Sequence, residues 1–150
     1  MRITPETIPL EAPAMNFTHA MISFKGRLRR QHYFICQLFI VAAAVIALAH
    51  PFLTLLLIVP VSYCALAVTT KRLHDMEYSG WLILVPLGAL VATFIVIVLL
   101  AILGLNPLAN LMNYPYLAFL AGWNLWLICS PGMIGANQYG PDPKLPAPTT

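Results

Sequence analysis

Charged residues are scarce in this chain: Lys, Arg, Asp and Glu make up 9% of its 150 residues, against about 25% in ordinary soluble domains. None of the four occurs at positions 31–70 or 78–141. A membrane-spanning helix needs about 20 mainly apolar residues, so each of these gaps is long enough for two crossings. The shortage of charge therefore excludes an ordinary soluble domain and predicts an all-α integral membrane protein with four transmembrane helices.

Cysteine is also rare. The three cysteines, Cys36, Cys64 and Cys129, all fall within apolar runs, and no two are spaced as C-x-x-C. This pattern gives no indication of a disulfide framework or of a thiolate metal site. Four spans and their tails account for the whole length, which leaves no segment for a separate catalytic domain. We therefore expect no enzyme activity, no cofactor and no bound metal.

The order of polar and apolar runs divides the chain into three regions. Residues 1–23 contain several prolines without helical periodicity and are predicted to be a flexible N-terminal tail. Residues 24–143 form the predicted membrane domain, and residues 144–150 form a C-terminal tail. Polar positions 69–80 and uncharged positions 105–113 are predicted loops. The four predicted spans cover about residues 33–49, 52–70, 81–104 and 114–134.

The distribution of cations predicts the orientation. Residues 24–33 hold four cations before the first span, as in a short amphipathic basic segment at a membrane surface. The other cations lie in the two tails or in the loop at 69–80, and Lys- and Arg-rich segments favour the cytoplasmic side. We therefore predict that both termini are cytoplasmic. The cations are Arg2, Lys25, Arg27, Arg29, Arg30, Lys71, Arg72 and Lys144.

The first apolar run also admits a different interpretation. Positions 47–49 read Ala-Leu-Ala, which has the small-x-small form of a signal-peptidase site. The run is longer than a signal-peptide core and begins only after about 30 residues, so we expect an uncleaved span.

Three strings on the predicted cytoplasmic side go beyond composition. They are GRLRR at 26–30, KRLHD at 71–75 followed by SGW at 79–81, and NQYGPDP at 137–143. In this order they resemble the domain of unknown function 805 family of small bacterial inner-membrane proteins. The resemblance covers about residues 24–143. It implies a multi-pass protein of the bacterial cytoplasmic membrane, and it implies no assigned biochemical activity.

This sequence departs from the family pattern at three places. Arg29 precedes Arg30 where the family more often has Ser or Thr between its arginines. Lys71 replaces the first Arg of a pair, and Gln138 stands where Arg is frequent. These changes leave the order and spacing of the strings intact.

We predict that the three strings meet in one cytoplasmic pocket that binds an anion, above all a lipid headgroup. Arginine suits this role because its guanidinium contacts phosphate through two parallel hydrogen bonds. In this hypothesis arginines and a histidine face the anion, while Asp75 and Asn137 orient them. The candidate contacts are Arg27, Arg30, Arg72, His74, Asp75, Ser79, Trp81, Asn137 and Asp142.

The function predicted from these strings is a membrane-embedded interaction or scaffold module. Its expected partners are membrane lipids, anionic lipids in particular, and nucleic acid is not expected. Small residues at four-residue spacing, Gly88 with Ala92 and Ala118 with Gly122, permit close helix packing. A homo-oligomer or another membrane protein is therefore a further partner to consider.

Three other interpretations compete with this hypothesis. Lys71 and Arg72 could simply anchor a helix at headgroups, with Asp75 partly neutralising them. The adjacent His74 and Asp75 are reminiscent of metal-dependent phosphohydrolases, although too few further ligands are in sight.

The remaining alternative is a small transporter or channel subunit. Asn124, Ser62 and Thr93 could line a passive route through an oligomer. The third and fourth spans carry no charged side chain, however, and such groups normally mark ion and proton paths. The sequence therefore favours binding over transport.

Overall fold

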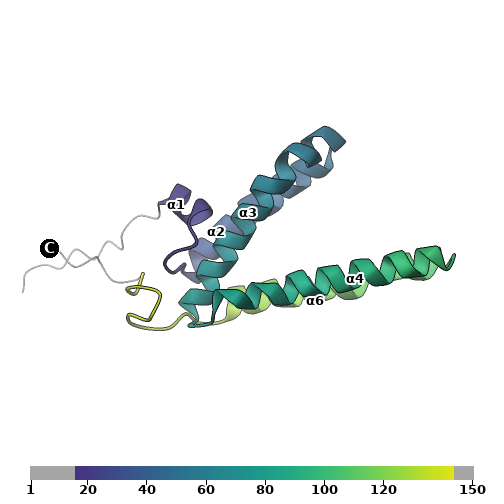
Figure 1. Ribbon diagram of the computed structural model, residues 1–150. Coiled ribbons are helices and arrows are strands. Elements are labelled where there is room, and N and C mark those ends of the chain that lie inside the picture. The colour runs from purple at the N-terminus through teal and green to yellow at the C-terminus, as the bar shows by residue number, and fades with distance from the viewer. Residues whose placement is uncertain (1–15, 144–150) are drawn as a thin grey trace, which may run out of the picture.

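The computed structural model describes residues 16–143, and the regular elements within them are helices (Figure 1). The all-α fold class is therefore confirmed for this part of the chain. Residues 1–15 and 144–150, most of the predicted tails, lie outside the described residues. The elements are α1 (Phe17–Ile22), α2 (Arg30–Leu48), α3 (Pro51–Asp75), the 3₁₀ helix η1 (Gly80–Ile83), α4 (Leu84–Ile102), α5 (Asn106–Leu111) and α6 (Asn113–Cys129).

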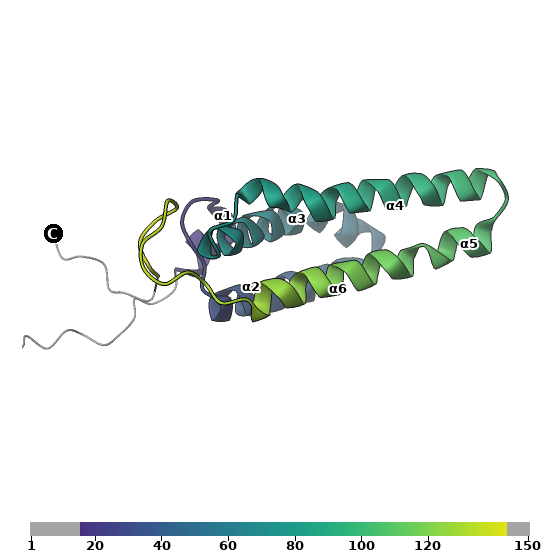
Figure 2. The same cartoon turned by 90° about the horizontal axis from the view of Figure 1, so that it is seen from below.

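The helices form two antiparallel pairs that diverge from a shared end (Figure 1). In the first pair, α2 and α3 are joined at His50, whose side chain accepts a hydrogen bond from the Phe52 N–H at 3.2 Å. Pro51 follows at the first helical position, where its missing N–H does no harm. In the second pair α6 returns beside α4, with α5 at the turn (Figure 2). The start of α2 and the ends of α3 and α6 therefore lie at the same end of the molecule.

Three helical segments are long and apolar enough to cross a membrane. They are Arg30–Leu48, Pro51–Asp75 and Gly80–Ile102, with mean hydropathies of 1.8, 2.2 and 2.9. The last of these buries none of its most apolar window inside the protein. Because its apolar side chains stay at least partly exposed, this surface is suited to lipid rather than water. The predicted span at 114–134 corresponds to α6, which has 17 residues, and a fourth crossing stays a prediction.

Two predicted loops are in fact largely helical. α3 continues through positions 71–75, and α5 occupies most of positions 105–113. The first error arose because charged residues were taken to end the span, whereas Lys71, Arg72 and Asp75 are buried. A helix can continue through charged residues when other segments supply their partners.

The N-terminal side also differs from the prediction. Residues 17–22, assigned to a flexible tail, form α1 and pack against α3. The Lys71 ammonium donates to the carbonyls of His19 at 2.7 Å and Ala20 at 2.5 Å, near the end of α1. Residues 24–29 are not helical, and the buried Leu28 donates its N–H to the Lys71 carbonyl at 3.1 Å. The predicted amphipathic basic segment is therefore not confirmed.

The buried apolar cluster joins α1, α2, α3 and α6. Its members are Ala20, Leu28, Tyr33, Cys36, Ile40, Val68, Leu73 and Leu127. Most lie near the start of α2 or near the ends of α3 and α6, so protein packing is densest at the shared end of the two pairs. This is the end at which the three sequence strings meet.

Candidate functional site

The centre of the shared end is one carboxylate held between two arginines. Arg72 donates from Nη1 to Asp75 Oδ2 at 2.6 Å, and Arg27 donates from Nε to Oδ1 at 3.2 Å. The two arginine side chains are 0% and 1% exposed, and that of Asp75 is 6% exposed. We call these three residues the Arg–Asp cluster. Charges this deeply buried persist only when they are paired and hydrogen-bonded.

The remaining guanidinium donors bind carbonyls at the end of α6 and in the segment that follows it. Arg72 donates to the carbonyls of Leu127, at 2.8 Å, and Ser130. Arg27 donates to the carbonyls of Met133 and Gly135. In place of the predicted contact with an anion, the two arginines of the cluster therefore bind the protein's own carbonyl groups. In the alternative interpretation, contact of Lys71 and Arg72 with headgroups is contradicted by the burial of both side chains, whereas the neutralisation of Arg72 by Asp75 is confirmed.

The third string closes over the same end. Asn137 donates from Nδ2 to the His74 carbonyl at 2.8 Å, and the Asn137–Gly140 pair forms a tight turn. The Tyr139 ring stacks on His74, with centroids 3.8 Å apart and planes inclined by 4°. His74 Nδ1 lies 3.3 Å from the Gly26 carbonyl of the first string. All three strings are thus in direct contact.

Two predicted site residues, Ser79 and Trp81, line a separate cavity together with His74, Gly80 and Tyr139. Ser79 accepts a hydrogen bond from the Trp81 N–H at 3.4 Å and so caps η1. Trp81 itself is 77% exposed. An exposed indole at the start of an apolar helix is typical of the membrane interface.

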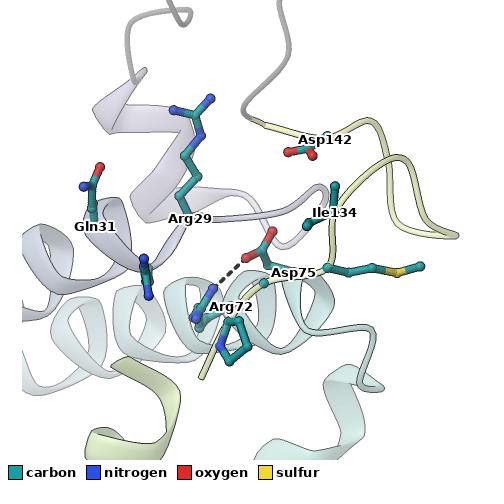
Figure 3. A pocket seen from close by; sticks show the side chains of 10 residues that line it. Arg29, Gln31, Arg72, Asp75, Ile134 and Asp142 are labelled. Carbon is teal, nitrogen blue, oxygen red and sulfur yellow. Dashed lines mark hydrogen bonds and ion pairs between the residues drawn. The ribbon is translucent and has the colours of Figure 1, made fainter. Parts of the chain in front are cut away.

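A cavity of about 280 Å³ lies beside the Arg–Asp cluster (Figure 3). The start of α2, the end of α3 and the segment after α6 contribute its walls. We call it the arginine pocket. It is lined by Arg29, Arg30, Gln31, Arg72, Asp75, Pro131, Gly132, Met133, Ile134 and Asp142.

Arg29 is the charged residue of this pocket that the sequence analysis did not select. Its Nε and Nη2 atoms are buried, and neither has a hydrogen-bond partner among residues 16–143. Leaving a buried donor unpaired costs about 1–3 kcal/mol, and more for a charged group. The neighbouring Arg30 is exposed. Three arginines stand close together in this string, and only the fold shows which of them has buried donors without a partner in the described part of the chain.

Asp142 forms another part of the pocket wall. It is 6% exposed, and its Oδ2 accepts the Gly135 N–H at 2.9 Å. Of the nine predicted contacts, Arg30, Arg72, Asp75 and Asp142 line this pocket. Arg27, His74 and Asn137 form contacts between the strings. Ser79 and Trp81 lie at the start of η1.

The metal-site alternative finds no support in this geometry. Both oxygens of Asp75 accept hydrogen bonds from arginines, so His74 and Asp75 do not act as a ligand pair. In the part of the chain that the structure describes, no three His, Cys, Asp or Glu residues are grouped to hold a metal ion.

A second cavity, of about 350 Å³, lies between the two helix pairs. Ser62 and Asn124 both line it, together with Gln37 and Tyr116, whereas Thr93 does not. Asn124 accepts from the Tyr33 hydroxyl at 3.1 Å and donates to the Leu120 carbonyl at 2.9 Å. No charged side chain is among the residues that line this cavity.

Comparison with known proteins places the chain in a family. The family model described as "Protein of unknown function (DUF805)" matches residues 21–141. "Inner membrane protein YhaI" of Escherichia coli strain K12 is 29% identical over 134 residues, which cover 82% of this chain and 87% of the relative. The protein of the same name from Escherichia coli O157:H7 gives the same values. No solved structure matches this chain.

Proposed function

The chain belongs to the DUF805 family of proteins of unknown function, and we propose that it is a membrane-embedded binding module whose arginine pocket holds the phosphate group of a lipid headgroup. The observation that carries this proposal is that the buried Nε and Nη2 atoms of Arg29, beside a cavity, have no hydrogen-bond partner among residues 16–143. Such a group needs an acceptor from outside the described residues. A phosphate offers several acceptor oxygens and a negative charge.

The surroundings of Arg29 suit a phosphate. Nε and Nη2 of one guanidinium can donate two parallel hydrogen bonds to two oxygens of the same group. Arg29 is also the N-cap residue of α2, a helix of 19 residues, and the N-terminus of a helix attracts anions. The exposed Arg30 adds a second positive charge at the pocket. These features act together on a ligand at the start of α2.

The Arg–Asp cluster gives the pocket a fixed wall. Because Arg72 and Asp75 bind each other and the backbone after α6, they keep Pro131–Ile134 in place opposite α2. We assign them a positioning role rather than contact with the anion. The proposed module therefore binds and holds its ligand without catalysing a reaction, and lipid is its primary partner.

Retention of lipid tests this proposal. Native mass spectrometry of the protein in mild detergent with added phospholipid is expected to show bound lipid for the wild type. Arg29→Gln should weaken that binding about tenfold or more, because a hydrogen bond to a charged group contributes about 1.5–3 kcal/mol. Lys25→Gln removes an exposed cation outside the pocket and is the matched control.

Thermal unfolding without added lipid separates binding from folding. Arg29→Gln should leave the stability unchanged or raise it, since the substitution removes a charge whose buried Nε and Nη2 donors have no partner among residues 16–143. Equal lipid retention by the wild type and Arg29→Gln would refute the proposal. A loss of stability in the absence of lipid would mean that Arg29 has a structural role instead.

We also propose four crossings with both termini in the cytoplasm. α6 runs antiparallel to α4 and returns to the shared end (Figure 2). Its 17 residues reach about 26 Å at about 1.5 Å per residue, close to the thickness of the hydrocarbon core. Locally thinned lipid, or α5 at the far end, can supply the remainder.

Labelling of single cysteines tests this topology. In a chain whose native cysteines are replaced by alanine, a cysteine at Asn110 should react with an impermeant maleimide added outside spheroplasts. A cysteine at Gln138 should react only after permeabilisation. Both positions are exposed, so a missing reaction reflects the side of the membrane. Labelling of Gln138 from outside would overturn the proposed orientation.

Transport is the less favoured function. The cavity between the helix pairs includes Ser62 and Asn124, which fits the transport alternative. Its polar lining is uncharged, and both polar ends of Asn124 already bind protein groups. The arginine pocket instead contains a cation without a partner among the described residues, which is the stronger indication of a ligand.

A further inference from the structure

The cavity between the two helix pairs is built from regularly spaced side chains. Its wall includes positions 62, 65, 66 and 69 of α3 and positions 116, 120, 123 and 124 of α6. Residues at these spacings lie on one face of a helix, so each of the two helices turns one face toward the cavity. We call it the interhelical cavity. Its volume of about 350 Å³ is within the range of small-molecule sites, about 300–1,000 Å³.

The interhelical cavity lies well inside the membrane-spanning part of the protein. Gln37 is seven residues from the start of α2, whereas Ser62 and Tyr116 are each 13 residues from the ends of α3 and α6. At about 1.5 Å per residue, these side chains lie about 10 Å and about 20 Å from the shared end. With the shared end at one membrane surface, the cavity occupies the middle third of a hydrocarbon core about 30 Å thick. Its occupant is therefore a molecule dissolved in the bilayer.

Three polar side chains of this cavity are available to such a molecule. Gln37, Ser62 and Tyr116 form no side-chain hydrogen bond with another residue of the range 16–143. Both polar ends of Asn124, by contrast, bind protein groups. The hydrocarbon core holds no bulk water that could pair with the three groups. Because no charged side chain lines the cavity, these groups favour a neutral ligand that carries oxygen atoms.

The positions of the three side chains restrict the shape of the ligand. Gln37 lies at one end of the cavity, and Ser62 and Tyr116 lie about 10 Å further from the shared end. A hydrogen bond at each end takes up about 3 Å of this length, so the two oxygens of the ligand are separated by little more than one ring. The acyl chain of a phospholipid has no oxygen at this depth. The indole of Trp123, in the same wall, offers an aromatic face to a planar ring.

We infer that the interhelical cavity binds a membrane quinone, which has a neutral ring with two opposite carbonyl oxygens and an apolar tail. The Gln37 amide donates to one carbonyl, and a hydroxyl of Ser62 or Tyr116 donates to the other. The tail lies toward the far ends of the helices, where the two pairs diverge (Figure 1). This site shares no lining residue with the arginine pocket and does not depend on the proposed phosphate site.

A matched pair of ligands tests the inference on the wild-type protein. Native mass spectrometry in mild detergent uses equal amounts of a decyl-substituted benzoquinone and of decylbenzene, which has the same ring and tail without the oxygens. We expect one bound quinone per chain and retention about tenfold or more above that of decylbenzene, since only the quinone accepts hydrogen bonds. Equal retention of the two compounds, or no retention of the quinone, would overturn the inference.

Substitutions at the two ends of the cavity locate the ligand. Gln37→Leu, and the double variant Ser62→Ala, Tyr116→Phe, should each weaken quinone retention about threefold to tenfold, because each removes donors to one carbonyl. Tyr114→Phe removes an exposed hydroxyl of α6 outside the cavity and is the matched control. Unchanged retention in both cavity variants would refute the inference.

A filled cavity gives an independent test. Ala65→Phe places a ring inside the interhelical cavity and should abolish retention of the quinone, while thermal unfolding shows whether the variant remains folded. Full quinone retention by the folded variant would place the ligand elsewhere and contradict the inference.

Phospholipid binding separates this inference from the proposed function. Arg29→Gln should leave quinone retention unchanged, and Gln37→Leu should leave phospholipid retention unchanged, because the two residues line different cavities. A wild-type protein that retains phospholipid but no quinone would overturn the quinone site alone. The opposite result would overturn the phosphate site alone.

Discussion

Asp75→Asn is expected to lower the free energy of unfolding by about 3–5 kcal/mol, the usual cost of removing one partner from a buried ion pair. Asp75 accepts from both Arg72 and Arg27, whose side chains are 0% and 1% exposed. An asparagine offers one neutral oxygen and turns an N–H group toward a guanidinium. Two buried charges would then lack a counter-charge.

The same substitution should also loosen the segment after α6. Arg72 and Arg27 hold Ser130, Met133 and Gly135 by their carbonyls, and Asp75 sets the position of both guanidiniums. Limited proteolysis of Asp75→Asn is therefore expected to cleave near these residues under conditions in which the wild type stays intact.

Glu77→Gln is the control for this prediction. It neutralises a carboxylate only two residues away, on an exposed side chain, and should change the stability by no more than about 0.5 kcal/mol. Thermal unfolding of both variants in one detergent gives the comparison. If Asp75→Asn unfolds like Glu77→Gln, the Arg–Asp cluster does not hold this end of the protein together.

The sequence predicts the membrane helices well because the signal is local. An apolar run without charge is sufficient to locate α2, and the predicted start at residue 33 differs little from the observed start at Arg30. The end of α3 is harder to predict. Lys71 and Arg72 end the apolar run, yet the helix continues because α1 and the end of α6 supply their partners.

The candidate site depends on contacts between distant parts of the chain. The three strings identify the right end of the molecule, since His74, Tyr139 and Gly26 meet there. They cannot show which arginines are already paired. Arg27 was a predicted anion contact and binds Asp75, whereas Arg29 was not predicted and has buried donors that find no partner within the described range 16–143.

Gly132 is a residue whose importance appears only in the structure. A Cβ atom at this position would lie 2.0 Å from Asp75 Oδ2 and 2.8 Å from Asp75 Cγ. The carboxylate cannot move away, because Arg72 and Arg27 hold both of its oxygens. Pro131–Ile134 would have to shift instead, which would break the bond from the Met133 N–H to the Asp75 carbonyl, at 2.8 Å.

Gly132→Ala is therefore expected to destabilise the protein by about 3 kcal/mol or more, at the upper end of the cost of overpacking. Gly122→Ala makes the same substitution within α6, where a Cβ atom would meet nothing within 4 Å. This control should be neutral or slightly stabilising, since alanine is favoured over glycine in a helix by about 1 kcal/mol.

Thermal unfolding compares the two variants, and native mass spectrometry with phospholipid shows whether the arginine pocket persists. Because Gly132 lines that pocket, a shifted backbone should reduce lipid retention in the protein that remains folded. Equal stability and equal retention in the two variants would mean that the segment after α6 is not held against Asp75 as closely as these contacts require.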